Sequence, residues 1–265
     1  MKLAQNTQPD SANDLNGDTP TLRVISLLEV IASKDQLFSL HDLSEETALP
    51  KATLHRMLHQ LENAGLLQRS GDGRRYGTGA RLSRLAENLL MNNIHRGAQR
   101  AVLRHLVDEI GESCNLTALT GNEVIYLDRV ETAAPLRFYL QAGSHVPAHC
   151  SASGKLFLAQ MTPAQRSRLL DHAPLQAYTP KTLVSVGALE KEILQVKKQG
   201  YAFDNEEFLP GLMCIAVLVP AEHGRSNLCI AAQAPTMRLT PDKALQMLPA
   251  LQRAANALGR ASPCI

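Results

Sequence analysis

Three adjacent residues of this 265-residue chain could carry nucleophilic chemistry: His149, Cys150 and Ser151. A histidine beside a thiol or hydroxyl can act as its general base. Adjacent residues of an extended segment point to opposite faces, however, so His149 is poorly placed to activate Cys150 if the run is extended. The sequence contains no GxSxG, SxxK or HExxH motif. These observations favour a protein that is not an enzyme.

The sequence gives little support for a metal site, for disulfide bonds or for a membrane span. The five cysteines, at 114, 150, 214, 229 and 264, form no CxxC pair, and the nine histidines are scattered, so we expect no metal site, no cofactor and reduced thiols. No apolar run reaches the roughly 18–20 residues of a membrane span. The first 19 residues lack the apolar core of a secretory signal. We therefore expect a cytoplasmic protein without a membrane partner.

The run 149–155, HCSASGK, also suggests a ligand site. It is rich in small residues and precedes a segment with helical character. Backbone N–H groups in the first turn of a helix have no partner within it and favour an anion such as a carboxylate. The alternative is a tight loop that needs small residues only for packing.

Positive charge is concentrated between residues 51 and 84. This segment holds seven Lys or Arg and two acids, whereas the whole chain carries only +2. If residues 51–64 form a helix, four apolar side chains share one face. The opposite face carries Ala52, His55, Arg56, His59, Gln60 and Asn63. This polar face could enter a major groove, or it could be a solvated basic surface.

The elements around this helix predict a winged helix-turn-helix. Helical spacing begins near Pro20, a capping box at 39–42 opens a second helix, and Leu49-Pro50 separates it from the third. A short hairpin follows Gly65, with Arg74 and Arg75 near its turn. We expect a disordered tail over 1–19, the DNA-binding domain over 20–80 and a linker helix over 81–95.

The remaining residues, 96–265, predict a mixed domain, so the fold class is α+β with two domains. Strands are expected over 114–120, 124–130, 136–141, 212–219 and 227–234. Helices are expected after 153–154, from Pro163, over 188–199 and over 239–258. The hairpin signal at Gly121-Asn122 indicates antiparallel pairing.

These segments resemble the IclR-type bacterial transcriptional regulators. The resemblance rests on LPKATLHRMLHQLENAGLL (49–67), the hairpin SGDGRRYGTGARL (70–82), HCSASGKLFLA (149–159), GYAFDNEEFLPGLMCIAVLVP (200–220) and Pro235-x-x-Arg238. It implies an all-α winged helix-turn-helix with a small β-hairpin wing and a GAF-like α/β effector domain with a largely antiparallel sheet. Ala52 departs from the family's usual Ser or Thr. The DNA-binding candidates are Lys51, Ala52, Thr53, His55, Arg56, His59, Gln60, Arg74 and Arg75.

The resemblance also implies an effector pocket in the second domain. Its lining candidates are Ala152, Ser153, Gly154, Asp204, Leu212 and Cys214. Gln233 is a further candidate. The family often has Ser at positions 231 and 233 of this strand, where this chain has Ala231 and Gln233. The loss of these hydroxyls suggests a ligand shaped differently from the smallest oxo acids. Arg137 could pair with a ligand carboxylate or simply be exposed, and Tyr139 could contact the ligand or belong to the core.

We therefore expect an effector-responsive transcriptional regulator, a repressor or an activator. The expected partners are a pseudo-palindromic double-stranded DNA operator, a small carboxylate from carbon-source or aromatic-acid catabolism, and RNA polymerase if the protein activates. The expected assembly is a homodimer or a homotetramer built as a dimer of dimers. One alternative is an enzyme that acts on a small carboxylate and uses its N-terminal helices for oligomerisation. Another is a DNA-binding scaffold without a ligand.

Overall fold

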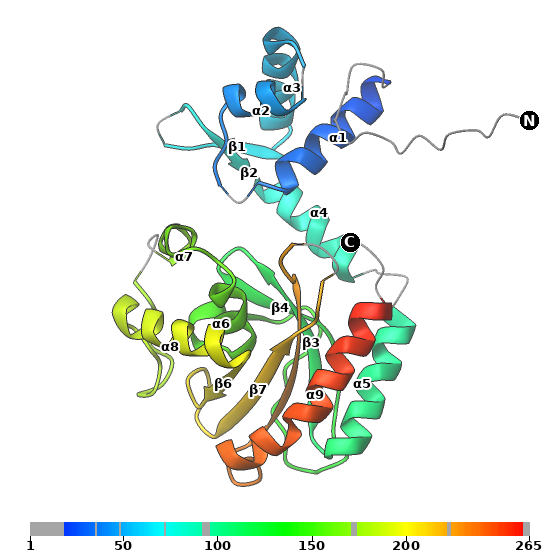
Figure 1. Cartoon of the computed structure of the whole chain (residues 1–265), viewed down its shortest axis with the longest axis vertical. Coiled ribbons are helices and arrows are strands. Elements are labelled where there is room, and N and C mark those ends of the chain that lie inside the picture. Colours follow the sequence, from blue (N-terminus) through cyan, green and yellow to red (C-terminus); the bar gives the residue numbers. More distant parts are fainter. Residues whose placement is uncertain are drawn as a thin grey trace, which may run out of the picture. The chain divides into compact units, whose positions relative to one another are not determined.

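The computed structural model describes residues 19–34, 36–47, 49–71, 73–91, 96–170, 174–221 and 224–261 (Figure 1). The chain divides into two compact units, Met1–Ala86 and Glu87–Ile265. The predicted disordered tail lies outside the described residues except for Thr19. Residues 92–95 of the predicted linker helix also lie outside them.

The first unit contains three helices, α1 (Pro20–Ala32), α2 (Leu40–Thr47) and α3 (Lys51–Asn63), a hairpin of β1 (Leu67–Arg69) and β2 (Tyr76–Thr78), and the start of α4 (Ala80–Met91). Leu27, Leu43, Leu54 and Leu58 are fully buried between these elements, because the apolar positions of each helix recur with helical spacing. This arrangement confirms the predicted winged helix-turn-helix.

Local sequence signals set the ends of these helices. Ser39 and Asp42 form the predicted capping box: the Ser39 N–H donates to Asp42 Oδ2 at 2.8 Å, and the Asp42 N–H donates to Ser39 Oγ at 3.3 Å. Helix α3 begins directly after Pro50, and Gly65 follows it with a left-handed φ of 71°. Phe38 adds a further backbone bridge to Tyr76 on β2.

The second unit is built on a six-stranded antiparallel sheet with the order β5-β4-β3-β8-β7-β6. The strands are β3 (Ser113–Thr120), β4 (Glu123–Val130), β5 (His145–Pro147), β6 (Tyr201–Asn205), β7 (Leu212–Leu218) and β8 (Leu228–Pro235). The predicted antiparallel α+β domain is confirmed.

Helices cover both faces of this sheet (Figure 1). Helices α5 (Arg96–Ile110) and α9 (Pro241–Ala261) pack on one face. The other face carries α6 (Ala152–Ala159), α7 (Pro163–Leu170) and α8 (Val186–Gln199). A 3-10 turn, Ala148–Cys150, leads into α6. None of the described helices is long and apolar enough to cross a membrane.

Two local predictions are wrong. Residues 136–141 form a loop and not a strand, with Leu136 and Tyr139 exposed to solvent. Backbone carbonyls of this loop accept hydrogen bonds from side chains, since Arg238 Nη1 donates to Leu136 O at 2.7 Å. Residues 148–150 form a 3-10 turn and not an extended segment, so His149 and Cys150 do not point to opposite faces of a strand.

Candidate functional site

Helix α3 presents a polar face above a buried apolar stripe. Leu54, Met57, Leu58 and Leu61 are buried in the core of the first unit. The opposite side of the helix is exposed and carries six of the predicted DNA-binding residues: Lys51, Ala52, His55, Arg56, His59 and Gln60. Thr53 is half-buried. This face displays hydrogen-bond donors and positive charge without an acid, which suits a major groove.

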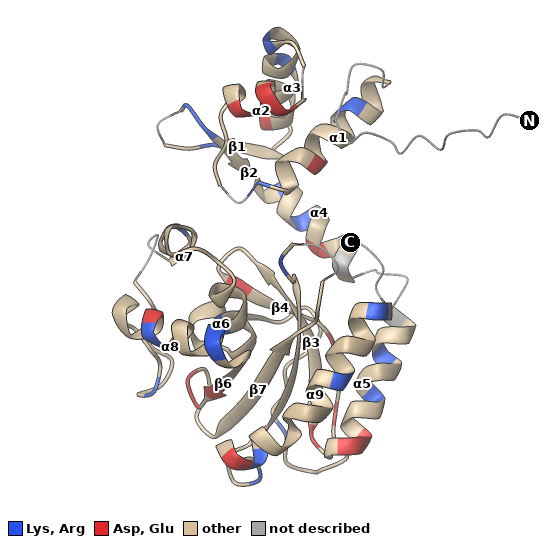
Figure 2. Ribbon diagram, viewed as in Figure 1, with Lys and Arg blue, Asp and Glu red and all other residues tan. Residues whose placement is uncertain are grey.

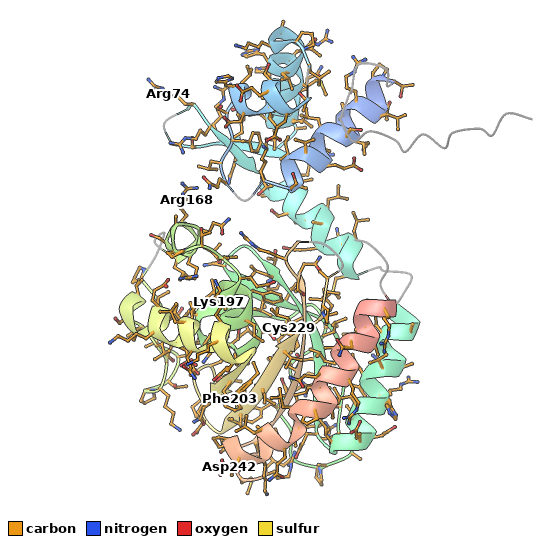
Figure 3. The ribbon with its side chains drawn as sticks, in the orientation of Figure 1. Arg74, Arg168, Lys197, Phe203, Cys229 and Asp242 are labelled. Carbon is orange, nitrogen blue, oxygen red and sulfur yellow. The ribbon has the colours of Figure 1, made fainter. Side chains whose placement is uncertain are left out.

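The β1–β2 hairpin adds a second basic surface. Arg74 and Arg75 are exposed, and Figure 3 shows Arg74 at the outer end of the hairpin. The turn is closed by Ser70, whose N–H donates to the Arg75 carbonyl at 2.8 Å. Such a hairpin can place its arginines on a phosphate backbone.

Acidic residues of the first unit gather on α2, as Figure 2 shows. Asp42 caps this helix, Glu45 lies 3.7 Å from His41, and Glu46 pairs with Lys34. Lys51 and Arg56 lie instead on α3, and Arg74 and Arg75 lie on the hairpin. The exposed polar face of α3 and the hairpin therefore carry net positive charge, since the one acid of α3, Glu62, pairs with Arg69.

A second candidate site is an enclosed cavity in the second unit, between the sheet and the N-terminus of α6. It is lined by Asn115, Thr117, Val124, Tyr126, Val146, Ser151, Ala152, Ser153, Asp204, Phe208, Leu212, Cys214 and Ala231. Its volume is about 20 Å³, which is room for about one water molecule. A larger ligand would require the lining side chains to move apart.

The first turn of α6 lies against this cavity, since Ser151, Ala152 and Ser153 line it. Ser151 is the N-cap and accepts a hydrogen bond from the Gly154 N–H at 3.1 Å. The Ala152 and Ser153 N–H groups occupy the first two helical positions, which have no partner within a helix. Gly154 has a packing role, since a Cβ at this position would lie 2.1 Å from the Ala148 carbonyl oxygen. The packing interpretation of the small-residue run thus holds at Gly154, whereas the ligand interpretation stays a prediction for Ala152 and Ser153.

Asp204 gives the cavity an acidic side. Its Oδ1 accepts hydrogen bonds from the N–H groups of Glu207 at 2.7 Å and Phe208 at 3.3 Å. Burial raises the pKa of Asp204 to about 7, the negative charge of Glu207 adds to the shift, and the two backbone donors oppose it. Cys214, its direct partner across β6 and β7, is a buried thiol whose pKa burial raises well above its usual range. This thiol is therefore protonated at neutral pH.

A β-bulge on β4 places the remaining polar residues on the cavity face. Arg129 pairs with Asn115, and Tyr126 pairs with Thr117, so two residues of β4 stand opposite Leu116. Without this extra residue, strict alternation would point Tyr126 and Arg129 to opposite faces. The bulge turns both toward the α6 side, together with Asn115.

The structure brings five predicted effector residues together in the cavity lining: Ala152, Ser153, Asp204, Leu212 and Cys214. Gln233 lies directly behind the lining, against Asn115. Arg137 and Tyr139 do not line the cavity: Arg137 pairs with Glu131 at 2.8 Å, and Tyr139 is 72% exposed. Contact of any of these residues with an effector stays a prediction.

Sequence reasoning missed the part of the cavity formed by β3 and β4. Asn115, Thr117 and Tyr126 line it but were not among the candidates. The available signal was the presence of polar side chains inside two apolar strands, since buried polar groups need partners and often serve a site.

The His149–Cys150 pair is not set up for nucleophilic catalysis. His149 Nε2 is engaged with the Gln176 carbonyl at 3.0 Å, and burial lowers the pKa of His149. Burial raises the pKa of the Cys150 thiol to about 12, so the reactive thiolate is scarce. Among the residues that the structure describes, no group of three His, Cys, Asp or Glu side chains could hold a metal ion.

Two family models match the chain. "IclR helix-turn-helix domain" covers residues 21–71, and "Bacterial transcriptional regulator IclR C-terminal" covers residues 89–260. The "Probable transcriptional regulator SauR" of Cupriavidus necator is 41% identical, over 91% of this chain and 96% of that protein. The "Transcriptional repressor IclR" of Escherichia coli is 33% identical, over 83% and 81%.

Solved structures have the same fold. The Thermotoga maritima IclR structure matches 91% of this chain and 97% of its own, with a TM-score of 0.60 and 24% identity. An IclR homolog from Microbacterium hydrocarbonoxydans, solved in complex with 4-hydroxybenzoate, matches 91% of this chain and 99% of its own, with a TM-score of 0.57 and 25% identity.

Proposed function

This chain belongs to the IclR family of DNA-binding bacterial transcriptional regulators, and we propose that it is a cytoplasmic member that senses a small organic acid. It binds a pseudo-palindromic operator as a homodimer or as a dimer of dimers. Two copies of α3 enter major grooves about one helical turn, or a multiple of it, apart, because a two-fold symmetric protein reads two half-sites of opposite orientation. It represses transcription or, if it activates, also contacts RNA polymerase.

The single observation that carries the DNA-binding proposal is the division of α3 into two faces. The buried stripe fixes the helix to its unit, which leaves His55, Arg56 and Gln60 exposed on the other side. These side chains are of the kinds that read base edges. Arg74 and Arg75 on the hairpin add sequence-independent phosphate contacts.

The effector proposal rests on the cavity between the sheet and α6. The N–H groups of Ala152 and Ser153 favour an anion at this position, and these residues line the cavity together with Asp204 and Cys214. The solved homolog that holds 4-hydroxybenzoate supports an acid from aromatic-acid or carbon-source catabolism. The acid acts as a switch only if it binds the two DNA-binding states unequally.

An enzymatic role is the less supported alternative. The buried Cys150 thiol and the engaged His149 ring offer no activated nucleophile. The protein is therefore proposed to bind its acid without transforming it.

The experiment that tests the DNA-binding proposal is selection of duplexes from a random 30-base-pair library by the full-length protein. We expect enrichment of an inverted repeat whose half-sites are separated by one helical turn or a multiple of it. An Arg56→Ala variant, used as the control, should enrich the same repeat less strongly, because it loses one base-edge contact. Enrichment of a single asymmetric half-site, or none at all by the unaltered protein, would contradict the proposal.

A further inference from the structure

A chain of buried polar side chains runs from Arg129 on β4 to the effector cavity. Gln233 on β8 is 2% exposed, Asn115 on β3 is 1% exposed and Arg129 is 8% exposed. The terminal amide atoms of Gln233 and Asn115 lie 3.1 Å apart, and the Tyr126 hydroxyl lies 3.4 Å from the same Gln233 atom. Asn115 and Tyr126 line the cavity, whereas Arg129 and Gln233 stand behind them.

The charge of Arg129 determines which way these amides point. The two atoms of a terminal amide are told apart by their hydrogen-bond partners. One terminal atom of Gln233 faces both Arg129 Nη atoms and lies 3.2 Å from Nη2. A guanidinium only donates hydrogen bonds, so this atom is the carbonyl oxygen. The Gln233 NH₂ group therefore faces Asn115 and Tyr126.

The orientation of Gln233 then sets that of its two neighbours. One N–H donates to Asn115, which must present its carbonyl oxygen, and the other donates to the hydroxyl oxygen of Tyr126. The second terminal atom of Asn115 is buried with no hydrogen-bond partner among the described residues; in this orientation it is the NH₂ group. Tyr126 keeps its proton, because burial raises its pKa, and this proton is not used by Gln233.

We propose that Asn115 and Tyr126 are the hydrogen-bond donors that receive the acidic group of the effector, and that Arg129 aligns them through Gln233. This inference rests on the proposed acid-sensing function and names the polar contacts of that site. Because both side chains donate, every oxygen of the ligand group must accept hydrogen bonds. A carboxylate and a sulfonate meet this requirement. Arg129 is a positioning residue, since it acts through Gln233.

The binding test uses calorimetric titration of the full-length protein with matched probes. The carboxylates are acetate, glycolate and 4-hydroxybenzoate, the sulfonates are methanesulfonate and 4-hydroxybenzenesulfonate, and the neutral counterparts are the three corresponding amides. Tyr126→Phe and Asn115→Ala should each lower the affinity for the tightest-binding acid about 10- to 100-fold, as expected for loss of a hydrogen bond to a charged group. For the amide of the tightest-binding carboxylate, the affinity of both variants should lie within threefold of that of the unaltered protein.

Val146→Ala is the matched control, because Val146 lines the same cavity without a donor. It should leave the ratio of acid to amide affinity unchanged. If no probe acid binds the unaltered protein, the proposed acid-sensing function fails, and this inference fails with it. If an acid binds and both donor variants retain its affinity, only the inference is overturned.

A second measurement needs no ligand and reports the orientation directly. In the NMR spectrum of the unaltered protein, the Gln233 side-chain amide protons should show nuclear Overhauser effects to the Tyr126 ring. In Arg129→Met these effects should weaken, because Gln233 no longer has a fixed orientation. Amide protons of Gln233 that lie against Arg129 and not Tyr126 would overturn the proposal.

Discussion

The Glu62 carboxylate on α3 accepts hydrogen bonds from Arg69 Nε on β1, at 2.9 Å to Oε1 and 3.0 Å to Oε2. The same guanidinium donates to the Gly73 carbonyl at 3.2 Å and lies 5.0 Å from the centre of the Tyr76 ring. Helix α3 and the β1–β2 hairpin are thus joined by the Arg69 side chain. The Arg69–Glu62 ion pair also neutralises the charge of Glu62. The exposed positive charge of α3 and the hairpin therefore comes from Lys51, Arg56, Arg74 and Arg75.

Replacing Arg56 by Ala should remove a base-edge contact of α3. Because a good bidentate base contact contributes about 1–3 kcal/mol, we expect operator affinity to fall about 5- to 150-fold in a gel-shift titration. The side chain is exposed, so the free energy of unfolding should change by less than about 0.5 kcal/mol. Unchanged operator affinity in the folded variant would mean that α3 does not read the DNA.

Replacing Arg74 by Ala should act differently, since a phosphate contact carries no sequence information. Affinity should fall about equally for the selected operator and for unrelated DNA. The slope of log affinity against log salt concentration should decrease by about 1. Lys198→Ala, on the exposed face of α8, is the control and should leave the slope unchanged. A slope that Arg74→Ala does not alter would remove the hairpin from the phosphates.

The sequence predicted the helix-turn-helix elements better than the cavity of the second unit, for a physical reason. Leu54, Leu58 and Leu61 mark one face of a helix by local spacing alone, and Pro50 and Gly65 mark its ends. The cavity depends on which strands pair and in what register. The bulge that turns Tyr126 and Arg129 toward α6 leaves no local pattern in the sequence.

For a related reason, the sequence could not show that residues 136–141 form a loop and not a strand. Arg137 and Tyr139 alternate with apolar residues as in a strand. The backbone of this loop is held instead by side chains from elsewhere in the chain, such as Arg238 and Arg129. Alternation alone cannot show whether a partner strand is present.

Replacing Lys155 by Met should strongly destabilise the second unit. The Lys155 ammonium is 1% exposed and donates to Glu207 Oε1 at 2.6 Å and Glu192 Oε1 at 3.0 Å. Removing it leaves the Glu207 carboxylate buried without a cation, which costs about 3–5 kcal/mol. Urea unfolding should show this loss, and the double variant Lys155→Met, Glu207→Gln should recover part of it. A loss below about 1 kcal/mol would show that the pair contributes little to folding.

The raised pKa of Asp204, about 7, has consequences for pH dependence. Since this value lies above the unfolded value of 3.8, ionising Asp204 costs stability, and the free energy of unfolding should fall as pH rises from about 4 to about 7. An anion in the cavity should raise the pKa further, so acid binding takes up a proton.

We therefore expect acid affinity to fall as pH rises from 6 to 8, by at most about tenfold per pH unit above the pKa of free Asp204. Calorimetry in two buffers of different ionisation enthalpy would report the proton uptake. Asp204→Asn should abolish both the uptake and the pH dependence. Affinity that rises with pH would show that ionised Asp204 accepts a hydrogen bond from the ligand.

The most direct test of the whole account is the operator dissociation constant measured with and without the probe acid that binds most tightly, in the unaltered protein and in Ser153→Trp. Ser153 lines the cavity and is 5% exposed, so an indole there fills the space the acid needs. We predict that the acid changes the operator affinity of the unaltered protein about 5- to 150-fold. Ser153→Trp should bind the operator as tightly as the unaltered protein does without acid, and the acid should not change that affinity. An equal response in both proteins, or none in either, would contradict the account.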